Sequence, residues 1–113
     1  MPQVTIYHNP RCSKSRQTLS LLEEQGIDPE IVLYLETPPD EKTLRALIEK
    51  LGIEAEDLIR RKEYRELGLE ETDDADDLVR HMAAHPQIIE RPIVVVDSRA
   101  RLGRPPESVL EIL

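Results

Sequence analysis

Residues 3–35 read QVTIYHNPRCSKSRQTLSLLEEQGIDPEIVLYL and contain the pattern that decides the fold. Residues 3–7 alternate between polar and apolar types and are rich in β-formers, which predicts a strand. Apolar side chains then recur at helical spacing over residues 18–22, and Gly26 stands where the C-terminal cap of that helix would fall. Residues 30–35 form a short apolar run typical of a second, buried strand. Together they predict a βαβ unit with parallel strands.

A helical segment is predicted after this unit. Asp40 is a suitable N-cap for a helix whose leucines recur at helical spacing and which Gly52 ends. A short helix is expected over residues 55–60. Another helix should begin at residues 72–73, and it should stop at Pro86 because proline cannot continue it.

The C-terminal part combines two strands with a last helix. Residues 93–96 are the β-branched run IVVV, which predicts a strand, and residues 100–102 are expected to return as its hairpin partner. Pro105 and Pro106 suit the first turn of a terminal helix. These elements predict a small α/β fold with a mixed sheet and a helical insertion at about 38–87.

Length and composition limit the class of protein. The 113 residues suit one domain covering 1–113, and 39% hydrophobic with 34% charged residues is the balance of a soluble globular chain. No apolar run approaches the roughly 20 residues of a membrane span, and the N-terminus lacks the pattern of a secretory signal. The net charge of -8 argues against nucleic acid and anionic lipid as partners. We therefore expect a cytoplasmic protein.

Cys12 is the only cysteine, and its position predicts chemistry. It follows a strand and a loop and precedes a helix, where free backbone N–H groups favour a bound anion or a thiolate. The nearby basic residues His8, Arg11 and Arg16 should lower its pKa further. The alternative is a buried cysteine that acts as a small apolar residue, but residues 8–16 hold almost no apolar side chain. We therefore predict that Cys12 is a nucleophile.

The spacing also limits the redox and metal chemistry. Ser15 stands where a dithiol oxidoreductase carries its second cysteine, so an outside thiol must resolve an oxidised Cys12. His81 and His85 lie one helical turn apart, as in some metal sites, but no third ligand is evident nearby. We expect no bound metal and no bound cofactor.

Residues 7–19, YHNPRCSKSRQTL, closely resemble the active-site segment of the glutaredoxin-coupled arsenate reductase (ArsC) family. Further motifs match in the same order along the chain: YLETPP at 34–39, LIR at 58–60, ELGL at 66–69, RPIVV at 91–95 and GRPP at 103–106. The resemblance covers essentially the whole chain. It implies a thioredoxin-like fold with a mixed four-stranded sheet, in which the helical insertion separates the βαβ unit from the C-terminal hairpin and helix.

The resemblance also implies a reaction. The Cys12 thiolate would attack arsenate, glutathione as co-substrate would attack the thiol–arsenate adduct, and glutaredoxin would reduce the mixed disulfide as arsenite leaves. His8 is expected to tune the ionisation of Cys12, and Ser15 to hydrogen-bond the thiolate. The arginines at the positions of the family's oxyanion-binding residues are Arg60, Arg91 and Arg104. Supporting roles fall to Arg16 and to Pro92, which matches the cis proline of thioredoxin-like folds.

Three functions remain open on the sequence alone. The first is a glutathione- and glutaredoxin-dependent arsenate reductase, acting on arsenate or a similar small oxyanion in arsenic detoxification. The second is a glutathione-dependent thiol reductase or transferase of the same fold. The third is a non-enzymatic, redox-linked regulator, ranked last because Ser15 replaces the second cysteine of a redox pair and the net charge is negative. In each case we expect a monomer.

Overall fold

The computed structural model describes residues 3–113, which divide into two compact units. The first unit holds the described residues up to Thr37 together with Arg91–Leu113, and the second is Pro38–Glu90. The helical insertion predicted at about 38–87 begins where the second unit begins, and the unit extends slightly beyond it to Glu90. That the whole chain acts as one domain stays a prediction.

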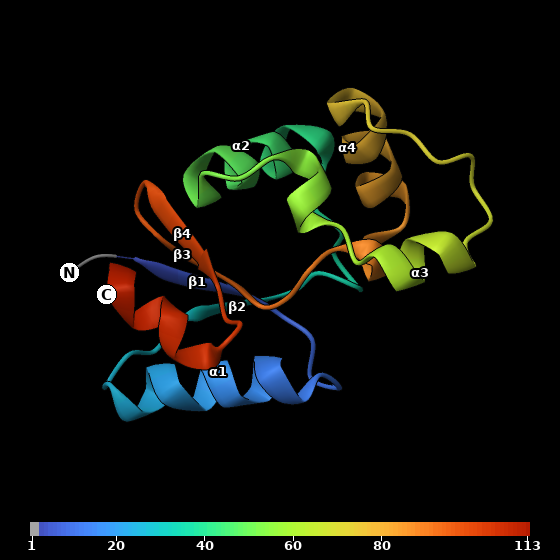
Figure 1. The fold of residues 1–113 in the computed structure, drawn as a ribbon. Helices are drawn as coiled ribbons and strands as arrows, with labels where there is room; N and C mark the ends of the chain where they lie inside the picture. The colour runs from blue at the N-terminus through green and yellow to red at the C-terminus, as the bar shows by residue number, and fades with distance from the viewer. Residues whose placement is uncertain (1–2) are drawn as a thin grey trace. The chain divides into compact units, whose positions relative to one another are not determined.

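The first unit is built on a four-stranded mixed sheet with the strand order β2-β1-β3-β4 (Figure 1). β1 (Val4–His8) runs parallel to β2 (Glu30–Leu33) and antiparallel to β3 (Ile93–Val96). β3 continues into β4 (Arg99–Leu102) as an antiparallel hairpin. The predicted mixed sheet, with its parallel first pair and its hairpin, is therefore confirmed.

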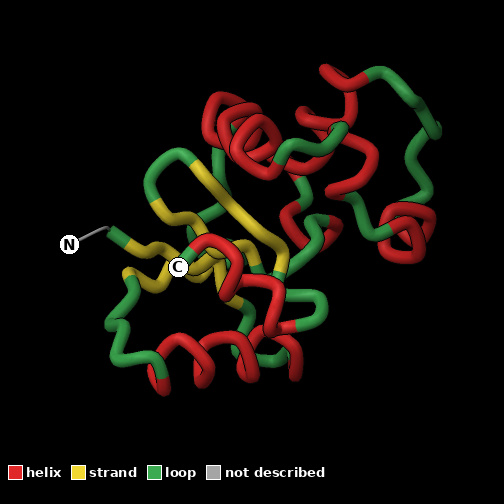
Figure 2. The backbone as a smooth tube through the Cα atoms, turned by 60° about the vertical axis from the view of Figure 1, so that its left-hand side comes forward, coloured by secondary structure: helices red, strands yellow, loops and turns green. Residues whose placement is uncertain are grey.

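Two helices of the first unit lie next to each other beside this sheet (Figures 1 and 2). α1 (Ser13–Glu24) ends just before Gly26, whose φ of 77° is the left-handed conformation that glycine adopts readily after a helix. η3 (Pro106–Ile112) begins at the expected proline, but it is a 3-10 helix.

The core of the first unit lies between the sheet and these two helices. In the pairing of β1 with β3, Val4 is opposite Val96 and Ile6 is opposite Val94, so four β-branched side chains share one face. The core cluster consists of the buried residues Val4, Ile6, Leu22, Val94, Val96, Val109 and Ile112. This packing fixes the direction in which α1 leaves the end of β1.

The second unit is helical, as predicted. It contains α2 (Glu41–Leu51), η1 (Ala55–Leu58), α3 (Arg61–Glu66), α4 (Ala75–Ala84) and η2 (Pro86–Ile88). The Asp40 carboxylate caps α2 by accepting from the Thr43 N–H over 2.8 Å, and Gly52 ends the helix with a φ of 69°. The start of α4 was placed slightly early, since the cap is Asp74, which accepts from the Asp77 N–H. Over residues 3–113, no helix has the length and apolar character needed to cross a membrane.

Replacing Leu22 by alanine should lower the free energy of unfolding by about 2–5 kcal/mol, because the side chain is fully buried and its loss leaves a cavity. The same change at Leu110, which is 40% exposed, should alter it by only about 0.5 kcal/mol. Urea unfolding of the full chain, followed by circular dichroism, measures both variants. Equal losses at the two positions would contradict the assignment of Leu22 to the core.

Candidate active site

Cys12 is the N-cap residue of α1, where the chain has left β1 and enters the helix. Its backbone is extended, with φ −90° and ψ 123°, and its N–H donates to the Asn9 carbonyl over 3.0 Å. The Arg16 N–H donates to the Cys12 carbonyl over 3.0 Å, which begins the helical hydrogen-bond pattern. The half-buried thiol therefore lies where the first N–H groups of a helix have no partner within the helix.

The pKa of the Cys12 thiol is lowered from its ordinary value. Partial burial is the largest influence and acts in the opposite direction, because it favours the neutral thiol. The backbone N–H of Ser15, the side chain of Arg91 and the backbone N–H of Lys14 each lower the pKa, and the positive charge of Arg91 adds to them. Together they outweigh burial and favour the thiolate, as expected for a cysteine at a helix start.

Two arginines from the C-terminal part of the chain approach the sulfur. The side chain and charge of Arg91 lower the pKa of Cys12, and Nη2 of Arg104 donates to Sγ over 3.6 Å. Arg104 also donates from Nε to the backbone carbonyl of Arg91 over 2.8 Å. The Nε of Arg91 is buried, and no residue of the range 3–113 accepts a hydrogen bond from it. An acceptor would stabilise such a donor, and an oxyanion supplies acceptors in a geometry that suits arginine.

Two cis peptide bonds carry these arginines. The bond between Arg91 and Pro92 is cis, as the resemblance implied, and the bond between Arg104 and Pro105 is also cis, which was not predicted. The Gly103 N–H donates to the Pro92 carbonyl over 3.0 Å, so the two segments are joined next to their arginines. Ile93 is opposite Leu102 in the hairpin, and this contact extends the pairing by one step, so Arg91 and Arg104 lie next to each other at its open end.

Gly103 is a site residue that the sequence reasoning missed. A Cβ atom here would lie 2.4 Å from Oγ1 of Thr18 and 2.7 Å from Cγ of Pro92, closer than non-bonded atoms approach. The Thr18 hydroxyl is itself held, since it donates to the Lys14 carbonyl over 2.8 Å. Only glycine lets the segment that carries Arg104 pack this tightly. The motif GRPP contained the signal, but its reason lies in contacts between distant parts of the chain.

His8 and Ser15 are joined by a short hydrogen bond, with Nδ1 and Oγ 2.6 Å apart, and both side chains are buried. The Ser15 oxygen also accepts from the Asn9 N–H over 3.0 Å. Burial, and secondly the charge of Arg16, lower the pKa of His8, which favours the neutral ring. The Ser15 hydroxyl was expected to bind the Cys12 thiolate; it faces His8 instead, and the backbone N–H of Ser15 reaches the sulfur.

Arg16 has a different role from the one expected. Arg11 and Arg16 were predicted to lower the pKa of Cys12 because they are close in sequence, but the cation that does so is Arg91. Arg16 instead donates from Nη1 to the Pro10 carbonyl over 2.8 Å. It therefore holds the loop that precedes the nucleophile.

Arg60, the third expected oxyanion residue, belongs to the second unit. Its Nε lies 3.1 Å from a carboxylate oxygen of Glu63 and 3.8 Å from one of Glu90. These contacts hold the guanidinium within its own unit. The first unit thus unites Cys12, His8 and Ser15 with two arginines, whereas a role for Arg60 at the sulfur stays a prediction.

The two histidines that were weighed as metal ligands lie in the second unit. His81 is near the end of α4, and its ring packs against that of Tyr64 with the centroids 5.7 Å apart. His85 caps the same helix. In the part of the chain that the structure describes, no group of three His, Cys, Asp or Glu residues could hold a metal ion.

Comparison with known proteins identifies the family. The model of the ArsC family matches residues 7–112. The chain belongs to the ArsC family. The solved structure of the arsenate reductase from Vibrio cholerae is 53% identical in sequence and superimposes with a TM-score of 0.92. The match covers 99% of this chain and 98% of that one. The expected thioredoxin-like ArsC fold is thereby confirmed.

Two curated relatives of this ArsC-family chain are similar over nearly their full length. The protein named arsenate reductase from Neisseria meningitidis is 50% identical, and the match covers 100% of both chains. The protein YfgD of Escherichia coli, described as uncharacterized, is 56% identical, and the match covers 98% of this chain and 97% of that protein.

Replacing Arg91 by glutamine should raise the pKa of Cys12, because the variant loses a charge that favours the thiolate. The ionised fraction at neutral pH should fall, and the rate of alkylation by iodoacetamide should fall with it. The matched control is Arg99→Gln, which removes an exposed cation from β4 and should leave the rate unchanged. Identical rate–pH profiles for wild type and Arg91→Gln would show that Arg91 does not tune the sulfur.

Replacing Gly103 by alanine should lower the free energy of unfolding by about 1–3 kcal/mol, because the added methyl group overlaps Thr18 and Pro92. The penalty should be smaller in a Thr18→Ala background, which removes the nearest overlapping atom. Denaturant unfolding of the two single variants and the double variant measures this coupling. The same penalty in both backgrounds would mean that Gly103 is not required for this contact.

Proposed function

We propose that this protein is an arsenate reductase in which Cys12 is the nucleophile and glutathione and glutaredoxin supply the electrons. The name of the Neisseria meningitidis relative, which is 50% identical over the whole chain, supports the substrate. The lowered pKa of Cys12 supports the nucleophile, because a larger share of the thiol is then ionised at neutral pH.

The observation that carries this proposal is the environment of Arg91. The same side chain lowers the pKa of Cys12 and has a buried Nε for which the described residues provide no acceptor. An oxyanion that accepts from this Nε would have its central atom close to the sulfur. Arg104 adds a second cation at Sγ. Two arginines and a thiolate in this arrangement suit attack on a tetrahedral anion such as arsenate.

The first step of the proposed reaction is substitution at arsenic. The Cys12 thiolate forms a sulfur–arsenic bond, and one hydroxyl group of arsenate leaves as water after taking a proton from solvent. Arsenic stays in its pentavalent state in this step. Arg91 and Arg104 would bind the arsenate oxygens and neutralise their charge, which otherwise repels the incoming thiolate.

The second step transfers electrons. The glutathione thiolate attacks the Cys12 sulfur, and the sulfur–arsenic bond breaks with its electron pair passing to arsenic. Arsenite leaves, and the two sulfurs are oxidised to a mixed disulfide. Glutaredoxin then removes the glutathione by thiol–disulfide exchange and regenerates the Cys12 thiolate. An external reductant is required because the chain has one cysteine and cannot form an internal disulfide.

Arg60 is proposed as a third oxyanion-binding residue, on the strength of the motif LIR at residues 58–60. The reaction needs one copy of the chain, and we place it in the cytoplasm, where glutathione is kept reduced.

In an assay coupled through glutathione, glutaredoxin and glutathione reductase, wild-type protein should cause NADPH to be consumed when arsenate is added. Cys12→Ser should be inactive because it removes the nucleophile. Arg91→Gln and Arg104→Gln should each lower kcat/KM for arsenate by about 10- to 100-fold, the effect of losing a charge-assisted hydrogen bond. The spectrophotometric rate measures all four proteins.

Arg99→Gln again serves as the control and should retain wild-type kcat/KM, because Arg99 is exposed on β4. A wild-type protein that is inert with arsenate would contradict the proposed substrate. Reduction of a small glutathione mixed disulfide by that same preparation would then identify the alternative, a glutathione-dependent thiol transferase.

A further inference from the structure

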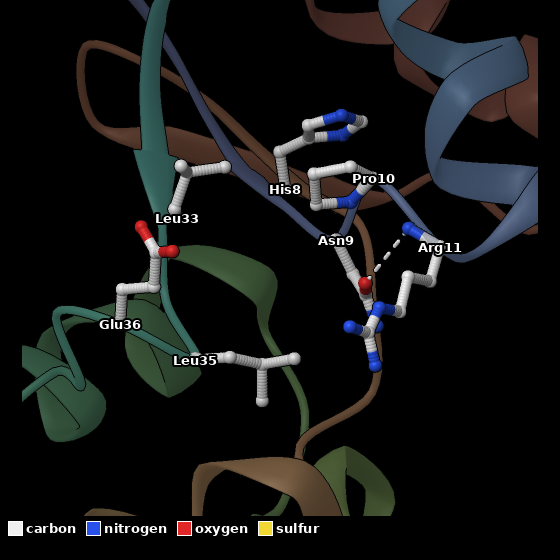
Figure 3. Close-up of a pocket in the computed structure, with 7 residues that line it drawn as sticks. All are labelled: His8, Asn9, Pro10, Arg11, Leu33, Leu35 and Glu36. Carbon is white, nitrogen blue, oxygen red and sulfur yellow. Dashed lines mark hydrogen bonds between the residues drawn. The ribbon is translucent and has the colours of Figure 1, made fainter.

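A cavity of about 330 Å³ opens on the first unit next to the loop that precedes Cys12 (Figure 3). One wall is the loop itself, with Asn9, Pro10 and Arg11, and the other is the end of β2 and the turn after it. Such a volume is at the lower end of the range for small-molecule sites. Cys12 does not line the cavity. The cavity is therefore distinct from the proposed oxyanion site, although both border the same loop.

The lining of this cavity combines opposite charges with apolar surface. Figure 3 shows Arg11 on one side of the hollow and Glu36 on the other, with Leu33 and Leu35 along the β2 side. Among residues 3–113, no side chain pairs with the Arg11 guanidinium or the Glu36 carboxylate. Leu35 is 42% exposed beside them. The lining therefore complements a small molecule that carries both charges and an apolar part.

The loop wall of the cavity is held in place by its own hydrogen bonds. The Asn9 side chain accepts from the Arg11 N–H over 3.0 Å, and Arg16 donates to the Pro10 carbonyl over 2.8 Å. The Cys12 N–H donates to the Asn9 carbonyl over 3.0 Å. The wall is thus preformed, and Cys12 follows its last residue, Arg11, in the chain.

We propose that this cavity binds the thiol co-substrate, a small peptide with one ammonium group, carboxylates and a thiol between them, which is the chemistry of glutathione. The ammonium group would face Glu36, a carboxylate would face Arg11, and the thiol would extend toward Cys12. This inference rests on the proposed function, in which glutathione attacks the sulfur of the Cys12–arsenate adduct. It assigns the residues that select the reductant, separately from Arg91 and Arg104, which would select the oxyanion.

Titration of the isotope-labelled full chain with S-methylglutathione tests the cavity directly, because this analogue cannot form a disulfide. The amide signals of residues 9–11 and 33–36 should shift and saturate. Glu36→Gln and Arg11→Gln should each weaken the affinity about three- to tenfold, since each removes one charge partner. The matched controls are Glu30→Gln and Arg99→Gln, which remove exposed charges elsewhere in the same unit and should leave the affinity unchanged.

Steady-state kinetics supply the second readout. Glu36→Gln should raise KM for glutathione by the same factor and leave KM for arsenate unchanged. If S-methylglutathione produces no saturable shift, or shifts signals away from the cavity, the inference is overturned even when arsenate reduction proceeds. If the chain does not reduce arsenate, the proposed function fails, but the titration with S-methylglutathione still decides whether the cavity binds the peptide.

Discussion

The position of Cys12 at the N-cap of α1 is the constraint on which the rest of the site depends. The N–H groups of Ser15 and Lys14 lower the pKa of the thiol because Cys12 is the N-cap residue, and the N-cap position follows from where β1 ends and α1 begins. Packing of Leu22 among the core valines and isoleucines holds α1 beside the sheet. The backbone fold alone therefore determines where the sulfur lies, and side chains then adjust its pKa.

The C-terminal segments complete the site from the other side of the sulfur. The β3–β4 pairing brings Arg91 and Arg104 to the same end of the hairpin, and the segment that carries Arg104 packs against Thr18 because Gly103 has no Cβ. The His8 ring hydrogen-bonds the Ser15 hydroxyl and not the sulfur in the described structure. The positive charges near the Cys12 sulfur therefore come from residues distant in the sequence. Residues close to Cys12 in the sequence hold the loop that precedes it.

The sequence predicted local features well and distant contacts poorly. The βαβ unit, the hairpin, the Asp40 cap and the helix start at Cys12 all follow from patterns within a few residues, and the structure contains each of them. Arg91 lowers the pKa of Cys12 although it is distant in the chain, whereas Arg16, which is near in the chain, donates to the Pro10 carbonyl. Gly103 was missed for the same reason. Whether the Ser15 hydroxyl faces the sulfur or His8 depends on the rotation of its side chain, which no pattern in the sequence specifies.

The most direct test of this account is the ionisation of Cys12 in the wild-type protein. The ultraviolet absorbance of the thiolate can be followed against pH, with Cys12→Ser as the blank that removes the contribution of tyrosine. We expect a midpoint below the ordinary thiol value of 9.0, because the N–H groups of the first helical turn and Arg91 outweigh burial. A midpoint at or above that value would contradict it, since a neutral thiol at physiological pH would be a poor nucleophile toward an oxyanion.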